Sequence, residues 1–133
     1  MTVGLAAFEE VIHPIPGLVA GGDMNTDAYQ YHFVKISADE AIALAGNNEM
    51  PIGVLCNKPL SGGGATVAGP ASTIKLKAGG SISAGNQLCP KSDGSGEAVA
   101  STTGDPSIAV ALVGGADHDL ITAYIVGGLT LHA

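Results

Sequence analysis

Short apolar segments separated by glycine-rich turns are the feature that most constrains the fold of this chain. Glycine occupies 20 of the 133 positions, and clusters such as Gly79-Gly80 recur between runs of β-branched residues. Glycine reaches the positive φ values that tight turns need. Apolar residues make up 46% of the chain but include no Trp, so the core must use small and β-branched side chains. We therefore predict an all-β fold, a compact β-barrel or β-sandwich of short strands, of the β-clip or barrel-sandwich type.

Alternation of apolar and polar residues predicts the individual strands. In residues 72–77 the alternation directs Ile74 and Leu76 towards the core and the lysines between and after them outwards. The other expected strands are 29–36, 51–57, 65–67, a hairpin return over 82–88, 97–101, 108–113 and 120–126.

One segment fits two local structures. Residues 37–45 read SADEAIALA. They match one helical turn capped by Ser37, with Glu40 at the third position of a capping box. They match equally well a turn followed by a short strand through Ile42 and Leu44.

The first 25 residues differ in character from the rest, so we expect an extended N-terminal arm over 1–25 and a β-rich domain over 26–133. Proline and glycine interrupt any helix or strand there, yet disordered tails are usually polar and this segment is apolar. Three alternatives stay open: the arm folds back over its own domain, docks on a neighbouring subunit or foreign surface, or is disordered. The expected contact residues are Phe8, Val11, Ile12, Ile15, Leu18 and Val19.

The charge balance excludes several classes of partner. The formal net charge is −7, Arg is absent, and the five Lys are scattered along the sequence. Nucleic-acid binding needs clustered cations, so we expect neither nucleic acid nor an anionic membrane surface as a partner. We find no signal peptide and no bilayer-spanning stretch, and we expect synthesis in a host cytoplasm. Cys56 and Cys89 do not form a CxxC pair, so two small buried thiols are expected, with a single disulfide as the alternative.

The search for chemistry leads us to expect no catalytic site, no metal and no cofactor. A nucleophile needs a base and an orienting group, and none of the four histidines has that setting; they are His13, His32, His118 and His132. Asp117-His118-Asp119 is the densest polar cluster, but we interpret it as a turn. Residues 93–97 place oxygens at alternate positions without a full calcium loop. The loop over 61–64 has glycines but no phosphate-binding Lys. We predict that the protein is not an enzyme.

The stretch from Lys75 to Leu88 resembles biotinyl- and lipoyl-carrier domains in its order of elements, in which a glycine-rich turn separates two short strands. A carrier needs its modified lysine at a hairpin tip between apolar neighbours. Lys91 is expected in a tip, but its surroundings are CPKSDG. This order of strands and turn therefore favours a barrel-sandwich type of fold more than a carrier role. A soluble binding or carrier module is the alternative function.

Residues 29–126 resemble a family of small phage capsid cement, or head decoration, proteins. The resemblance rests on the order of YHFVKI, PIGVLCNKP, STIKLKAGGSISAGNQL, EAVAS and SIAVALVGGADHDLITAYIV. It implies a β-rich virion protein that is usually clustered around capsid symmetry axes, often as a trimer, and that binds the outer surface of the major capsid protein shell. Such proteins bridge neighbouring capsid subunits and resist internal DNA pressure. The acidic balance fits the outer surface, because packaged DNA would repel it.

The apolar arm is a weak anchor when it acts alone. Burying four of its side chains contributes roughly 6–12 kcal/mol, whereas ordering its backbone costs on the order of 10–20 kcal/mol. Strand addition to a sheet edge would supply the missing hydrogen bonds, and several linked subunits would multiply a weak contact. The arm therefore predicts a homo-oligomer.

Overall fold

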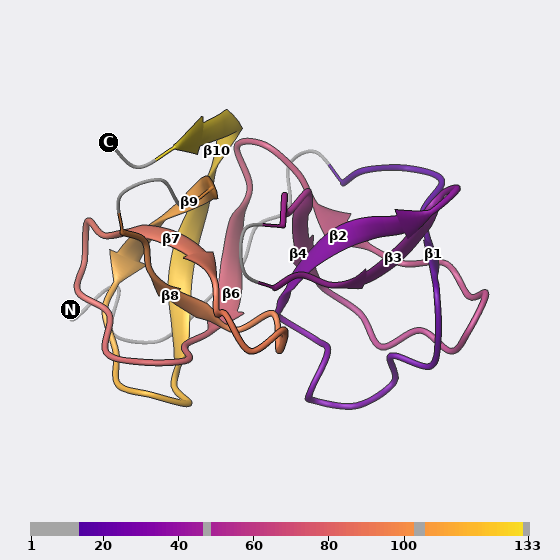
Figure 1. Cartoon of the computed structure of the whole chain (residues 1–133), viewed down its shortest axis with the longest axis horizontal. Coiled ribbons are helices and arrows are strands. Elements are labelled where there is room, and N and C mark those ends of the chain that lie inside the picture. Colours follow the sequence, from indigo (N-terminus) through magenta and orange to yellow (C-terminus); the bar gives the residue numbers. More distant parts are fainter. Residues whose placement is uncertain (1–13, 47–48, 103–105, 132–133) are drawn as a thin grey trace, which may run out of the picture.

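The computed structural model confirms an all-β fold. It describes residues 14–46, 49–102 and 106–131, and for 106 and 127–131 it describes the backbone alone. The described residues form ten strands and no helix (Figure 1). Accordingly, this part of the chain offers no helix that could cross a membrane. The strands are β1 (Val19–Ala20), β2 (Phe33–Ala38), β3 (Ala41–Leu44), β4 (Gly53–Leu55), β5 (Val67–Ala68), β6 (Thr73–Lys77), β7 (Gln87–Pro90), β8 (Ala98–Ala100), β9 (Pro106–Val113) and β10 (Leu120–Leu131).

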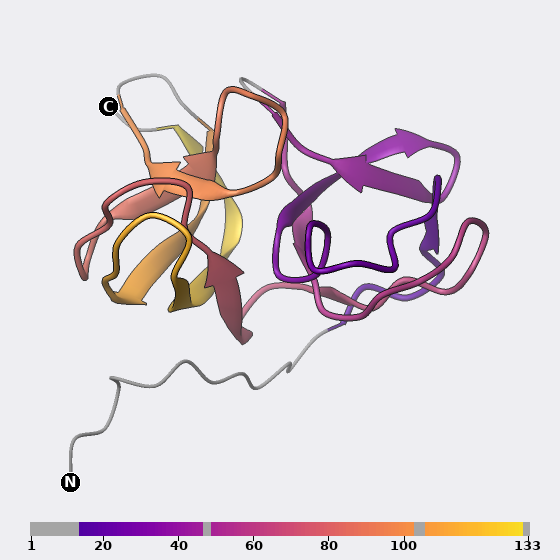
Figure 2. The ribbon, with the colours of Figure 1, turned by 90° about the horizontal axis from the view of Figure 1, so that it is seen from below.

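The strands build two five-stranded sheets that lie side by side (Figure 2). The first sheet has the order β1-β3-β2-β4-β5, and the second has the order β6-β10-β9-β7-β8. Pairing is antiparallel except between β1 and β3. The two sheets are tied by backbone hydrogen bonds: Phe33 N–H donates to Gly96 O at 2.7 Å, and Lys77 N–H donates to Tyr31 O at 2.9 Å.

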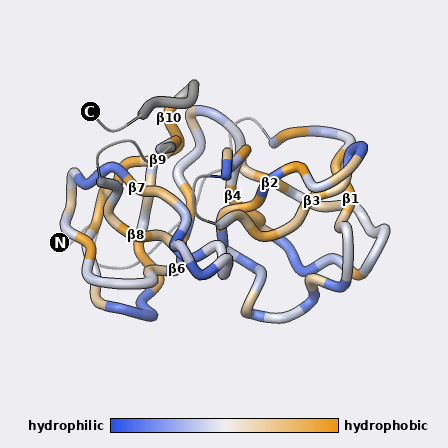
Figure 3. The backbone as a smooth tube through the Cα atoms, viewed as in Figure 1, coloured by the Kyte–Doolittle hydropathy of each residue, from blue (hydrophilic) through white to orange (hydrophobic). Residues whose placement is uncertain are grey.

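The main hydrophobic core spans both sheets. From the first sheet come Phe33, Val54 and Ala68, all fully buried. In β6 the predicted alternation is confirmed, because Ile74 and Leu76 are buried while the lysines between and after them are partly exposed. Figure 3 shows stretches of hydrophobic colour in strands of both sheets, whereas many of the connecting loops are white or blue. A shared core makes the two sheets one packed unit.

A second cluster covers the other face of the first sheet. Val34, Ile42 and Leu55 point into it from β2, β3 and β4. Leu18, Ala20 and Met24 close it from the N-terminal side. This part of the predicted arm therefore packs on its own domain, as in the alternative in which the arm folds back. Residues 14–24 are continuous with the first sheet, while the function of the arm stays a prediction.

Close backbone approach explains one glycine of the first sheet. A Cβ at Gly53 would lie 2.3 Å from the carbonyl oxygen of Ala68 and 2.6 Å from Val67 Cγ1. Such contacts are too short for any side chain. Gly53 therefore allows β4 and β5 to pair at the edge of this sheet.

Two local predictions differ from the structure. Residues 82–88 do not return as a hairpin on β6, because β6 pairs with β10 and β7 pairs with β8 and β9. The strand expected over 29–36 begins only at Phe33, because Tyr31 adopts a positive φ of 66°. Of the two alternatives for 37–45, the strand is correct. Glu40, with φ of 57°, ends any helical turn before β3.

Candidate interaction surface

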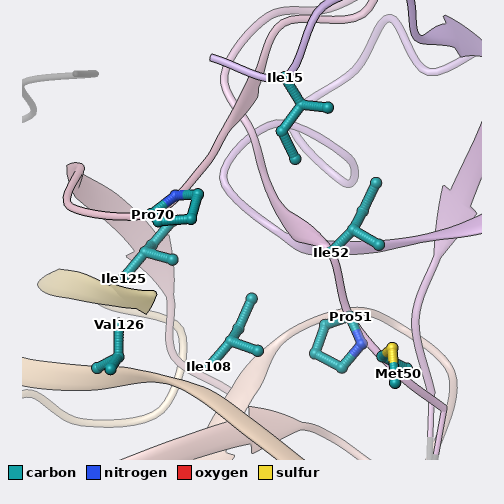
Figure 4. Close-up of a pocket in the computed structure, with 8 residues that line it drawn as sticks. All are labelled: Ile15, Met50, Pro51, Ile52, Pro70, Ile108, Ile125 and Val126. Atoms are coloured by element: carbon teal, nitrogen blue, oxygen red, sulfur yellow. The ribbon is translucent and has the colours of Figure 1, made fainter. Parts of the chain in front are cut away.

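An apolar groove lies where the two sheets meet. It encloses about 280 Å³. Figure 4 shows its lining side chains arranged around the open space. None of the lining residues is charged or polar: they are Ile15, Met50, Pro51, Ile52, Pro70, Ile108, Ile125 and Val126. An opening of this kind binds aliphatic or aromatic groups in preference to ions.

The groove is built by segments that are distant in sequence. Ile52 N–H donates to Val34 O at 2.8 Å, which fixes the wall leading into β4. On the opposite wall, Ala71 N–H donates to Ile125 O at 2.8 Å, and Ile125 N–H donates to Ser72 O at 2.9 Å. These bonds hold Pro70 beside β10. Because backbone hydrogen bonds fix both walls, we expect the groove to be preformed.

A charged turn supports the rim of the groove without entering it. Glu49 forms an ion pair with Lys35 of β2 and accepts a hydrogen bond from Gly46 N–H at 2.7 Å. The hydrogen bond from Lys35, followed by that from Gly46, holds the pKa of Glu49 below its usual value. The next residue, Met50, is an apolar side chain that is 58% exposed on the rim.

The predicted arm residues have different positions. Ile15 is half-buried in the groove, Leu18 is buried in the second cluster, and Val19 lies in β1 opposite Ala41. Phe8, Val11 and Ile12 lie outside the described residues. Of the predicted contact residues that the structure describes, Ile15 is therefore the one at the groove.

The sequence prediction missed the remaining groove residues. Met50 and Pro51 follow a polar turn, and nothing in their local pattern marks them as surface. A signal did exist in β10, where apolar residues occupy both faces. Ile121 and Ile125 face the core, while Tyr124 and Val126 are exposed. A strand that is apolar on both faces is typical of one that is covered on both sides.

The polar clusters noted in the sequence form turns. Asp119 Oδ2 accepts from Ala116 N–H at 2.9 Å, which confirms the turn predicted at Asp117-His118-Asp119. Asp93 Oδ1 accepts from Ser95 N–H at 3.0 Å in the β7–β8 turn. Within the described residues, no group of three or more His, Cys, Asp or Glu side chains could hold a metal ion. Cys56 and Cys89 are not joined by a disulfide.

Lys91, the lysine considered for a carrier role, lies at the end of β7. Its Nζ is 3.7 Å from Asp93 Oδ2 and 4.0 Å from Glu97 Oε1. Its side chain is therefore directed towards the carboxylates of its own turn.

His32 is the buried titratable group of this region. Its Nδ1 lies 2.8 Å from Gln30 O, and the Gln30 side chain donates to Cys56 O at 2.8 Å. Burial lowers the pKa of His32 below its usual value, although the hydrogen bond to Gln30 opposes the shift. A neutral, buried histidine beside the junction of the sheets is a packing residue.

Comparison with known proteins was made at the level of sequence and of fold. No protein-family profile matches the chain, and no curated protein sequence does. Among solved structures, the head fiber gp8.5 N base of bacteriophage phi29 aligns with a TM-score of 0.61 and 20% identity. The chain folds like a phage head fiber base. The alignment covers 86% of this chain and 95% of the other, so the likeness extends over nearly the whole of both. At this identity it shows the fold alone.

Proposed function

We propose that this chain is a structural protein of a phage virion, bound to the outer surface of the head. There it binds the major capsid protein and links neighbouring subunits, which stabilises the head against internal DNA pressure. The observation that carries the proposal is the fold likeness to a phage head fiber base over almost the full length of both chains. The segment order that resembles capsid cement proteins supports it independently.

The distribution of charge favours the outer surface. The chain carries 12 acidic residues against five lysines. Three of these lysines are paired with carboxylates: Lys35 with Glu49, Lys58 with Asp27 and Lys91 with Asp93. Lys75 lies 5.6 Å from the centre of the Tyr31 ring. The described surface therefore offers no cluster of unpaired cations for phosphate contacts, and packaged DNA would repel it.

The proposed active form is a homo-oligomer, a trimer, and the proposed role of the first 13 residues is to join its subunits, so that they attach to the capsid together. Burial of Phe8, Val11 and Ile12 would contribute roughly 5–9 kcal/mol. Association costs an estimated 4–15 kcal/mol in lost translational and rotational freedom. One arm alone therefore binds weakly. Several arms that join the subunits of one assembly stabilise it, and the joined subunits then hold the capsid through several contacts at once.

Co-sedimentation with purified capsids tests the proposal. Capsids lacking this protein are mixed with it, pelleted and imaged by electron microscopy, and new surface density at regular positions is expected. If the protein stays in the supernatant at saturating concentration and the capsid surface is unchanged, the proposal is refuted.

A truncation tests the arm separately. Deletion of residues 1–13 should reduce capsid occupancy while leaving the fold intact, because Leu18 and Met24 of the second cluster remain. A longer deletion, to residue 25, would remove both core residues and confuse unfolding with lost binding. The matched control is Leu60→Ser, which removes an exposed apolar side chain outside the groove and should bind normally. Equal occupancy of the truncated and full chains would show that the arm is not needed for attachment.

A further inference from the structure

We propose that the groove between the two sheets receives the N-terminal segment of a second copy of this chain, through Phe8, Val11 and Ile12. The inference rests on the proposed function in one respect, the self-association that the function requires. It assigns that self-association to a particular surface and a particular segment.

The chemistry of the groove fits this occupant. Its walls are aliphatic, and its rim carries Met50 and Val126, which are 58% and 38% exposed. A space of about 280 Å³ has room for more than one aliphatic or aromatic side chain. The first 13 residues of the chain contain Leu5, Phe8, Val11 and Ile12 but no lysine. Burial of Glu9 or Glu10 without a partner would cost free energy, so both carboxylates must stay in water while the apolar side chains enter the groove.

The chain enters the groove at Ile15. Ile15 N–H donates to Val67 O at 3.0 Å, and Pro14 forms an antiparallel bridge with Ala68. Continued pairing would next bring the segment past Pro70, which has no N–H to donate. Pro70 is therefore a poor partner for continued strand pairing beyond the bridge of Pro14 with Ala68.

The composition of residues 5–13 favours a neighbouring copy as the host. This stretch, LAAFEEVIH, contains no Gly, Pro, Asn, Asp or Ser. These are the residues that form reverse turns. A segment without them is poorly suited to fold back so that Phe8 returns to the groove that Ile15 already lines. It is better suited to run on and leave its own domain.

The segment is long enough to reach a neighbour. Thirteen residues span at most about 43 Å when extended, at roughly 3.3 Å per residue. A folded unit of this size has a radius of gyration of about 14 Å. Contact from the segment of one copy to the groove of the next is heterologous, so repetition generates either a closed ring or an open filament. A closed ring is the form that a discrete homo-oligomer requires.

Cysteine pairing between two different chains tests the inference directly. One chain carries Phe8→Cys, the other carries Met50→Cys, and both carry Cys56→Ser to remove the partly exposed native thiol. The purified chains are mixed and mildly oxidised, and the heterodimer is measured by mass spectrometry. The control replaces Met50→Cys by Leu60→Cys, an equally exposed apolar position at 59%.

The expected result is at least ten-fold more heterodimer with the Met50→Cys chain than with the Leu60→Cys chain. Equal yields from the two partners would overturn the inference. It would also be overturned if a disulfide formed only when Phe8→Cys and Met50→Cys are placed in one chain, because the groove would then hold its own segment.

A second variant provides a test that does not depend on oxidation. Met50→Lys places a charge on the exposed rim, where the fold tolerates it, and should weaken self-association at least ten-fold in sedimentation experiments. Leu60→Lys should leave self-association unchanged, and equal behaviour of the two variants would contradict the inference. Both tests need no capsid. If the protein binds capsids but shows neither the preferential heterodimer nor the weakened self-association, the groove assignment alone is refuted. If it shows both effects but does not bind capsids, the proposed function alone is refuted.

Discussion

Leu18→Ala is the substitution that decides whether residues 14–24 belong to the folded domain. Leu18 is 9% exposed and packs in the second cluster with residues of β2, β3 and β4. Its carbonyl oxygen accepts a hydrogen bond from Ala65 N–H at 2.9 Å, which the substitution leaves in place. The change therefore removes side-chain packing and little else.

The expected loss follows from the burial. Leu→Ala substitutions in protein cores cost about 2–5 kcal/mol, depending on how far the site collapses. Leu18 lies beneath a loop at the edge of the sheet, where neighbours can relax, so we expect about 2–3.5 kcal/mol. For a chain of this length, about 3–5 °C of Tm is lost per kcal/mol, which corresponds to a decrease of roughly 6–18 °C.

Urea and thermal unfolding followed by circular dichroism measure this loss. Leu60→Ala is the matched control, because Leu60 is 59% exposed and its truncation should change stability by no more than about 0.5 kcal/mol. If the two variants unfold alike, Leu18 does not contribute to the core. The reasoning would then be wrong, and a boundary at residue 25 would describe the chain better.

Two further predictions follow from the packing of the first sheet. Gly53→Ala should destabilise the fold by about 1–3 kcal/mol, because its Cβ would overlap Ala68 O; Gly64→Ala, with open space at its Cβ, should be nearly neutral, and equal denaturation midpoints would contradict this. His32 has a lowered pKa in the folded state, so the unfolded chain binds its proton first as the pH falls. Stability should therefore decrease as the pH falls from the unfolded value near 6.5 towards the lowered folded value, by at most about 1.4 kcal/mol per pH unit. His32→Gln should flatten that part of the profile, and an unchanged slope would rule His32 out as its source.

The sequence was sufficient to predict the class of fold and much of its local structure. Alternation identified Ile74 and Leu76 as core residues, and both are fully buried. The apolar run at 51–57 contains β4, whose three residues are all buried. These predictions succeed because burial on one or both faces leaves a direct trace in the local pattern.

Strand partners were not predictable in the same way. The turn at Gly79-Gly80 suggested a hairpin, but Ile82 instead forms a bridge with Gly115, and β6 pairs with β10. Residues 14–24 are a related case. Pro14 and Gly17 interrupt regular structure locally, yet β1 pairs in parallel with β3, more than 20 residues further along the chain. Pairing between distant segments depends on the whole core, and no local pattern records it.

The groove could be located only from the structure, although the sequence of β10 carries a partial signal of it. Its walls come from five separate stretches of chain, so no motif could have located it. The trace it left is the second apolar face of β10, where Tyr124 and Val126 remain exposed beside buried Ile121 and Ile125. An isolated domain gains nothing from this second face, whereas a subunit that is covered by a neighbour does. Because Val126 belongs to both the groove and this exposed face, an occupant of the groove would also extend along β10. A single apolar contact surface can therefore serve both the groove and the strand beside it.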